Sequence, residues 1–224
     1  MRMPVHRVFR WPMGLLLMVS ATACVADDFL DLRAVKPVQG DAARGETLAA
    51  TCGACHGPGG NAVIPTFPKL AGQKVGYLYW KLVQFKREGR QESPMTALVS
   101  PLSDADMRDL AAYFASSKSV APTAAPKPST GATLFRDGAA ERGIPPCQAC
   151  HGDHGEGIDI AGEPQYAVYP RLQGQQPAYL TQRLTEFRDG KRRFTSSEQV
   201  MSGVARSLSD EDIRAVSDWL PYAQ

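Results

Sequence analysis

The chain has 224 residues, of which 43% are hydrophobic and 21% are charged, and its formal net charge is +2. This length allows one or two domains, and the composition is that of an ordinary globular protein. Basic and acidic side chains nearly balance, so nothing favours nucleic acid binding. The short basic run Lys191-Arg192-Arg193 is expected to be a solvent-exposed patch.

Residues 1–26 are predicted to form a secretory signal peptide. Three arginines precede an apolar run at residues 15–19, which is too short to span a bilayer, and small residues follow. We expect cleavage after Ala26 and export to the periplasm, with no integral membrane segment in the mature form. Cys24 could carry a lipid anchor instead, but the residue three positions before it is smaller than a lipobox prefers.

Residues 27–117 are predicted to form a first helical domain. An alanine-rich helix capped by Asp41 is expected to run into Cys52, and a glycine- and proline-rich loop follows. Helical spacing of apolar residues returns over residues 75–88. Ser103 is a good N-cap for a last helix, which turns Met107 towards the core.

Residues 118–130 are rich in alanine and proline and are predicted to be a linker, and residues 131–224 a second domain. Helices are expected over residues 130–137, 178–188 and 209–220. The second half repeats the first, including a P-x-L-x-G-Q block and an L-S-D helix start. Two tandem copies of one all-α domain is the simplest explanation.

The motif Cys-x-x-Cys-His occurs once in each half and is typical of c-type haem attachment. The thiols form thioethers with the haem vinyl groups, and the histidine ligates the iron from the proximal side. The predicted attachment residues are Cys52, Cys55, Cys147 and Cys150, and the predicted proximal ligands are His56 and His151. The sequence therefore predicts two covalently bound haem c groups.

Two other interpretations of the cysteine pairs are weaker. A thioredoxin-like dithiol requires a surrounding βαβ pattern, which the sequence does not show. A zinc site pairs two Cys-x-x-Cys motifs over about 12–20 residues. Here Cys52 and Cys147 are 95 positions apart.

Methionine is the predicted distal ligand of each iron. Beyond residue 26 the methionines are Met95, Met107 and Met201. Met95 and Met201 each lie seven residues before the leucine of an L-S-D helix start, in expected loops, whereas Met107 has no methionine counterpart. We therefore assign Met95 and Met201 as ligands. His154 follows His151 too closely to reach the distal side, and it is expected to be a solvated loop residue.

These paired motifs resemble those of the two-haem cytochrome c4 family, over about residues 40–224. The resemblance implies two tandem cytochrome c-like domains related by a pseudo-two-fold axis, with haems close to each other across the interface. It also implies that the carbonyl groups of Pro68 and Pro170 orient the axial histidines. A loop at residues 152–169 is longer than its counterpart and departs from the pattern.

An iron held by an imidazole and a thioether has no open position, so a carrier of single electrons is expected rather than an enzyme. The resemblance implies a membrane quinol-oxidising complex as donor and a haem–copper terminal oxidase as acceptor. One alternative is the electron-accepting cytochrome subunit of a periplasmic dehydrogenase. Another is a two-haem peroxidase, which would need one open or displaceable iron position.

Overall fold

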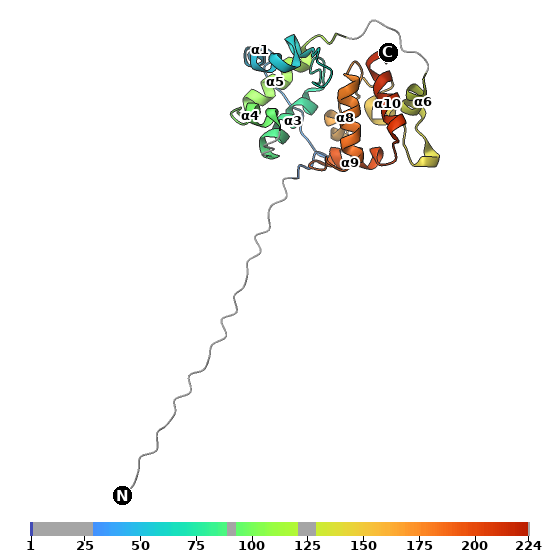
Figure 1. Ribbon diagram of the computed structural model, residues 1–224. Coiled ribbons are helices and arrows are strands. Elements are labelled where there is room, and N and C mark those ends of the chain that lie inside the picture. Colours follow the sequence, from blue (N-terminus) through green and yellow to red (C-terminus); the bar gives the residue numbers. More distant parts are fainter. Residues whose placement is uncertain (2–28, 89–92, 121–128, 224) are drawn as a thin grey trace.

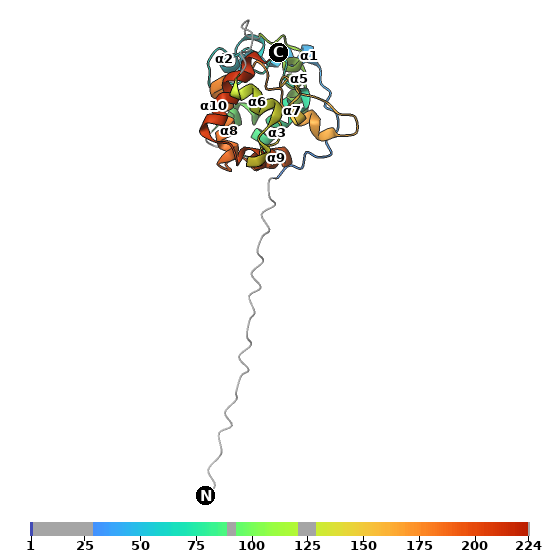
Figure 2. The same ribbon diagram turned by 90° about the vertical axis from the view of Figure 1, so that its right-hand side faces the viewer.

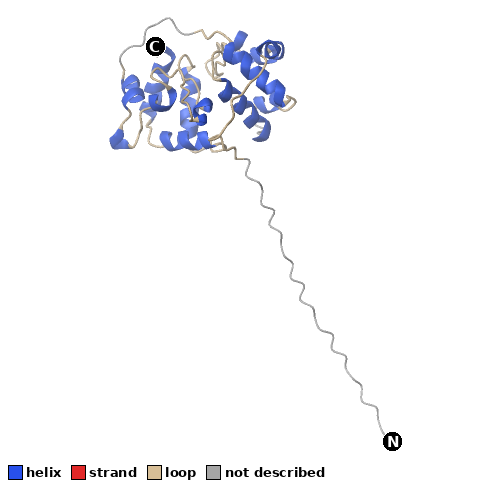
Figure 3. Cartoon of the chain, turned by 180° about the vertical axis from the view of Figure 1, so that it is seen from behind, coloured by secondary structure: helices blue, strands red, loops and turns tan. Residues whose placement is uncertain are grey.

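The computed structural model describes Met1 and residues 29–88, 93–120 and 129–223. The predicted signal peptide, Cys24 and most of the predicted linker lie outside these residues. Within them the chain forms two groups of helices, one from each half of the sequence (Figure 1). The described part contains isolated β-bridges but no strand (Figure 3), which confirms the all-α prediction. None of its helices is long and apolar enough to cross a bilayer.

In its described residues, the first half contains five α-helices and one 3-10 turn. They are α1 (Ala42–Leu48), α2 (Ala50–His56), η1 (Pro58–Gly60), α3 (Val75–Glu88), α4 (Pro94–Val99) and α5 (Asp104–Ser116). The single helix expected before Cys52 is thus two helices. They meet at Ala49, where ψ is −9° and the backbone leaves regular helical geometry.

The second half repeats the order of the α-helices and adds the 3-10 turns η2 and η4. Its elements are α6 (Thr130–Asp137), η2 (Ala140–Arg142), α7 (Gln148–His151), η3 (Pro164–Val168), α8 (Pro177–Arg188), α9 (Ser196–Ala205), α10 (Asp210–Trp219) and η4 (Leu220–Tyr222). When the view is turned by 90°, α6, α7 and α10 face the viewer, with the first half behind them (Figure 2).

In each half the first helix crosses the last one at close range, and a glycine makes this possible. A Cβ atom on Gly45 of α1 would lie 2.0 Å from the carbonyl oxygen of Asp109 in α5. A Cβ atom on Gly131 of α6 would lie 2.0 Å from the carbonyl oxygen of Ala215 in α10. Any side chain would therefore separate these helices.

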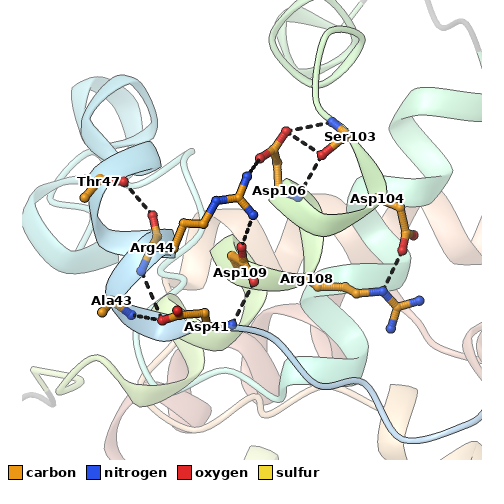
Figure 4. Close-up of polar contacts among 9 residues, drawn as sticks. All are labelled: Asp41, Ala43, Arg44, Thr47, Ser103, Asp104, Asp106, Arg108 and Asp109. Carbon is orange, nitrogen blue, oxygen red and sulfur yellow. Dashed lines mark hydrogen bonds and ion pairs between the residues drawn. The ribbon is translucent and has the colours of Figure 1, made fainter.

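Polar contacts reinforce the crossing in the first half (Figure 4). The Arg44 guanidinium bridges the carboxylates of Asp106 and Asp109. Asp109 also accepts a hydrogen bond from the backbone N–H of Asp41, at 2.7 Å. The predicted caps are present, because Asp41 caps α1 and Ser103 forms a capping box with Asp106.

Each half has its own apolar core, and Met107 is 4% exposed in the first one, as predicted. The N-terminal segment, which we define as residues 30–32, packs elsewhere. The backbone of Leu30 exchanges hydrogen bonds with Phe194 and Ser196 of the second half, at 2.8 and 3.0 Å. Leu30 and Leu32 are 7% and 3% exposed. The segment thus joins the start of the first predicted domain to the second.

Candidate functional site

The first Cys-x-x-Cys-His motif lies on α2. Cys52 and Cys55 are three residues apart and share one face of this helix. His56 is its last residue and is 6% exposed. Its Nδ1 lies 2.9 Å from the carbonyl oxygen of Pro68. Because Nδ1 is committed to this carbonyl, Nε2 is the ring nitrogen that remains for an iron.

The second motif is built in the same way. Cys147 is the N-cap residue of α7, Cys150 lies one turn later, and His151 ends the helix. His151 is 5% exposed, and its Nδ1 lies 2.9 Å from the carbonyl oxygen of Pro170. The two thiols and one oriented imidazole of each motif therefore fit a covalently attached haem.

Burial tunes these groups towards haem chemistry. It lowers the pKa values of His56 and His151, and this outweighs the opposing effect of the proline carbonyls, so both rings are neutral near pH 7. Burial also raises the pKa of the Cys147 thiol to about 11. It raises the pKa of the Cys52 thiol as well, and a raised pKa disfavours the thiolate that a redox dithiol needs. No three His, Cys, Asp or Glu side chains in the described residues cluster as a metal site.

Both predicted methionine ligands lie in short helices, and the expectation that they lie in loops is wrong. Ser93 caps α4, and Met95 is its second residue. Thr195 caps α9, which carries a half-buried Met201. Ser93 and Thr195 cap these helices without a capping box, whereas Ser103 and Ser209 of the L-S-D starts each form one, which makes the later helices easier to predict from sequence. Met95 packs against the first core, as Cys52 does. The ligand roles of Met95 and Met201 remain predictions.

Two further predictions have opposite outcomes. His154 is exposed, as expected for a solvated loop residue.

The basic run at residues 191–193 was expected to be a solvent-exposed patch, but Arg192 is only 6% exposed. Its guanidinium pairs with the carboxylates of Glu186 and Glu198, at 2.9 and 3.3 Å, and these partners make its burial possible.

The two halves meet through reciprocal hydrogen bonds from two buried glutamines. The Gln73 side chain bonds the backbone of Arg171, and the Gln175 side chain bonds the backbone of Lys69. Both glutamines end a P-x-L-x-G-Q block. Equivalent residues thus make equivalent contacts in both directions, as a pseudo-two-fold axis requires.

The long loop at residues 152–169 supports this interface. Lys74 at the start of α3 donates hydrogen bonds to the carbonyl oxygens of Ile158 and Tyr166, both at 2.5 Å. A Cβ atom on Gly76 would lie 2.5 Å from the carbonyl oxygen of Ala167, so a glycine is required for this approach. The long loop, which departs from the family pattern, therefore forms part of the contact between the halves.

A buried charge network crosses the interface beside α3. Glu198 of α9 is 3% exposed and accepts hydrogen bonds from Lys81 at 2.7 Å and from Gln84 at 3.0 Å. Burial would raise the pKa of Glu198, but Lys81 and Arg192 hold it at about 2. The carboxylate is therefore charged throughout the physiological range. Sequence patterns give no sign of this network, whereas the repeated glutamines were visible in the motif.

Known proteins show the same organisation. The family model for cytochrome c matches residues 42–118 and again 129–224. Cytochrome c4 of Stutzerimonas stutzeri is 42% identical over 191 residues, covering 81% of this chain and 88% of that protein. A thiosulfate dehydrogenase electron acceptor of Stutzerimonas stutzeri strain A1501 is 33% identical, covering 76% of this chain and 78% of that one.

Solved structures agree. The crystal structure of reduced cytochrome c4 from Pseudomonas stutzeri superposes with a TM-score of 0.72 and 40% identity, covering 83% of this chain and 100% of that one. The cytochrome c4 relatives are electron-transfer proteins with two covalently bound haem c groups, and both motifs needed for attachment are present here. The chain therefore belongs to the cytochrome c family and, within it, to the two-haem cytochrome c4 group.

Proposed function

We propose that this protein carries single electrons in the periplasm from a membrane quinol-oxidising complex to a haem–copper terminal oxidase. The proposed iron ligands are His56 with Met95 in residues 27–117, and His151 with Met201 in residues 131–224. Residues 118–130 are the proposed linker. The observation that supports this proposal best is the matched pair of buried histidines, each with Nδ1 on a proline carbonyl.

The residues of this chain favour electron transfer over bond chemistry. When bound, each haem supplies a one-electron iron couple. The carbonyl of Pro68 or Pro170 fixes the imidazole, so that its orientation is the same in both oxidation states. Met95 and Met201, as thioether ligands, would leave no iron position for a substrate and would favour the reduced state. Little rearrangement then accompanies the gain or loss of an electron.

The partnership with a periplasmic dehydrogenase is a second candidate, and one observation favours it. Two relatives, 33% and 34% identical to this chain, are thiosulfate dehydrogenase electron acceptors. The same two-haem architecture would accept electrons from such an enzyme. Stopped-flow reduction can separate the two candidates. Faster reduction by quinol-supplied membranes supports the first, and faster reduction by a thiosulfate dehydrogenase with thiosulfate supports the second.

The ligand assignment is tested by optical spectroscopy of the oxidised holoprotein. Methionine ligation gives a weak near-infrared sulfur-to-iron band, so Met201→Ala and Met95→Ala should each remove about half of it. Met107→Leu is the matched control, because it replaces a core methionine by a side chain of similar volume and should leave the band intact. A full band in Met201→Ala would contradict the assignment, as would a purified mass without two haems.

A further inference from the structure

The peptide group between Pro68 and Lys69 is held from both sides. Its carbonyl oxygen lies 2.9 Å from Nδ1 of His56 in the same half. Its N–H donates to Oε1 of Gln175 in the other half, at 2.8 Å. Nε2 of Gln175 also donates to the carbonyl oxygen of Lys69, at 3.0 Å. A glutamine of the second half is therefore one peptide group away from the axial histidine of the first.

The same arrangement runs in the opposite direction. The carbonyl oxygen of Pro170 lies 2.9 Å from Nδ1 of His151. The N–H of the same peptide group, on Arg171, donates to Oε1 of Gln73 at 2.7 Å. Nε2 of Gln73 donates back to the carbonyl oxygen of Arg171, at 2.8 Å. Each histidine is thus connected to the half of the protein that does not contain it.

Both glutamine side chains are buried and held by hydrogen bonds. Gln73 and Gln175 are 6% and 7% exposed. Each Oε1 also accepts the N–H of the next residue, at 2.9 Å for Lys74 and 3.0 Å for Gln176. Three hydrogen bonds therefore hold each amide where the dielectric constant is low, and there a hydrogen bond polarises its neighbours most strongly.

We propose that each half of the protein positions and tunes the axial histidine of the other half, with Gln175 acting on His56 and Gln73 acting on His151. This inference depends on the proposed function, because it takes both histidines as iron ligands. The peptide group is conjugated, so an acceptor on its N–H increases the negative charge on its carbonyl oxygen. That oxygen then accepts more strongly from Nδ1–H and makes the imidazole a more basic ligand.

A more basic imidazole stabilises ferric iron and lowers the reduction potential. Removing a glutamine should therefore raise the potential of the haem in the opposite half. Gln175→Ala should raise the potential of the haem at Cys52 and Cys55, and Gln73→Ala that of the haem at Cys147 and Cys150. Each variant should leave the other potential nearly unchanged, and the double variant should show both shifts.

The experiment combines a redox titration with NMR of the reduced, low-spin holoprotein. The resonance of each histidine Nδ1–H reports its hydrogen-bond strength, and it should move upfield crosswise with the potential. Gln176→Ala is the matched control. Its side chain also crosses the interface, donating to the carbonyl oxygen of Ala62 at 2.7 Å, but holds no peptide group that bonds a histidine. Gln176→Ala should therefore change neither the reduction potentials nor the Nδ1–H resonances.

A shift in the same half as the mutation, no shift, or an equal shift in Gln176→Ala would overturn the inference. If alanine variants do not assemble, Gln175→Met and Gln73→Met keep the side-chain volume and replace them. A wild-type protein without the near-infrared band would instead contradict the proposed ligands. A wild type with that band but no crosswise shift would refute only the tuning by glutamine.

Discussion

The charge network around Glu198 gives the sharpest stability prediction. Glu198→Gln keeps the shape of the side chain and removes its charge. The half-buried Lys81 and the buried Arg192 then lose their shared counter-ion, although Arg192 retains Glu186. Breaking a buried pair on one side usually costs about 3–5 kcal/mol. We therefore expect a substantial loss in the free energy of unfolding at pH 7.

The pKa of Glu198 gives an independent magnitude. It is about 2 in the folded protein, against an ordinary value of 4.5. This difference corresponds to about 3 kcal/mol of stability, because one pKa unit is worth about 1.4 kcal/mol. The two magnitudes agree, so the expected loss in Glu198→Gln is about 3 kcal/mol.

The sign of the pH dependence follows from the lowered pKa. The carboxylate stabilises the fold above pH 4.5, and this contribution is lost as the pH falls from 4.5 towards 2. Urea denaturation of the holoprotein, followed by circular dichroism at pH 7 and at pH 3.5, measures it. The difference in free energy of unfolding between wild type and Glu198→Gln should be smaller at pH 3.5 than at pH 7.

The matched control is Asp31→Asn, which removes the acid of an exposed ion pair with Arg33. Exposed pairs contribute little, so no measurable change in the urea midpoint is expected. If Glu198→Gln unfolds at the same urea concentration as wild type, or if the two proteins keep a constant difference between pH 7 and 3.5, the reasoning fails.

Two further predictions concern the contacts that join the halves. Gly76→Ala should cost about 1–3 kcal/mol, because its Cβ atom would lie 2.5 Å from the carbonyl oxygen of Ala167, whereas Gly203→Ala, with no atom within 4 Å, should cost nothing in the same urea titration. Leu32→Ala empties a buried site and should cost about 2 kcal/mol. The Ser196 amide, which bonds the N-terminal segment, should then exchange hydrogen faster, and unchanged exchange would contradict this role.

Local signals in the sequence predicted much of the helical framework. The helix over residues 75–88 has the predicted bounds, as has the one over 130–137. The capping boxes of Ser103 and Ser209 explain why these helix starts were readable, since a cap and its partner lie three residues apart. Likewise, each Cys-x-x-Cys-His motif is contiguous in the sequence, so it can be recognised without knowledge of the tertiary structure.

Features that depend on distant partners were not predictable. The sequence predicts a solvent-exposed Arg192, because its carboxylate partners become neighbours only after folding. The N-terminal segment gives no sign that it will pair with residues 194–196. The interface glutamines Gln73 and Gln175 were partly predictable. Their repetition in the P-x-L-x-G-Q block was visible, but the crossing of their contacts to the opposite half appears only in three dimensions.

The hydrogen bonds of Gln73 and Gln175 are symmetric across the interface, but the residues that follow these glutamines differ in charge. Lys74 and Gln176 follow the two equivalent glutamines and both reach across to backbone carbonyls, yet one is charged and the other neutral. After burial, Lys74 is a further cause of the lowered pKa of His151. A positive charge that disfavours a protonated imidazole also favours the reduced form of an iron on that imidazole. The crosswise hydrogen bonds should therefore affect both sites alike, whereas Lys74, which is paired with Asp159 at 2.8 Å, places a charged group on one side of the interface only.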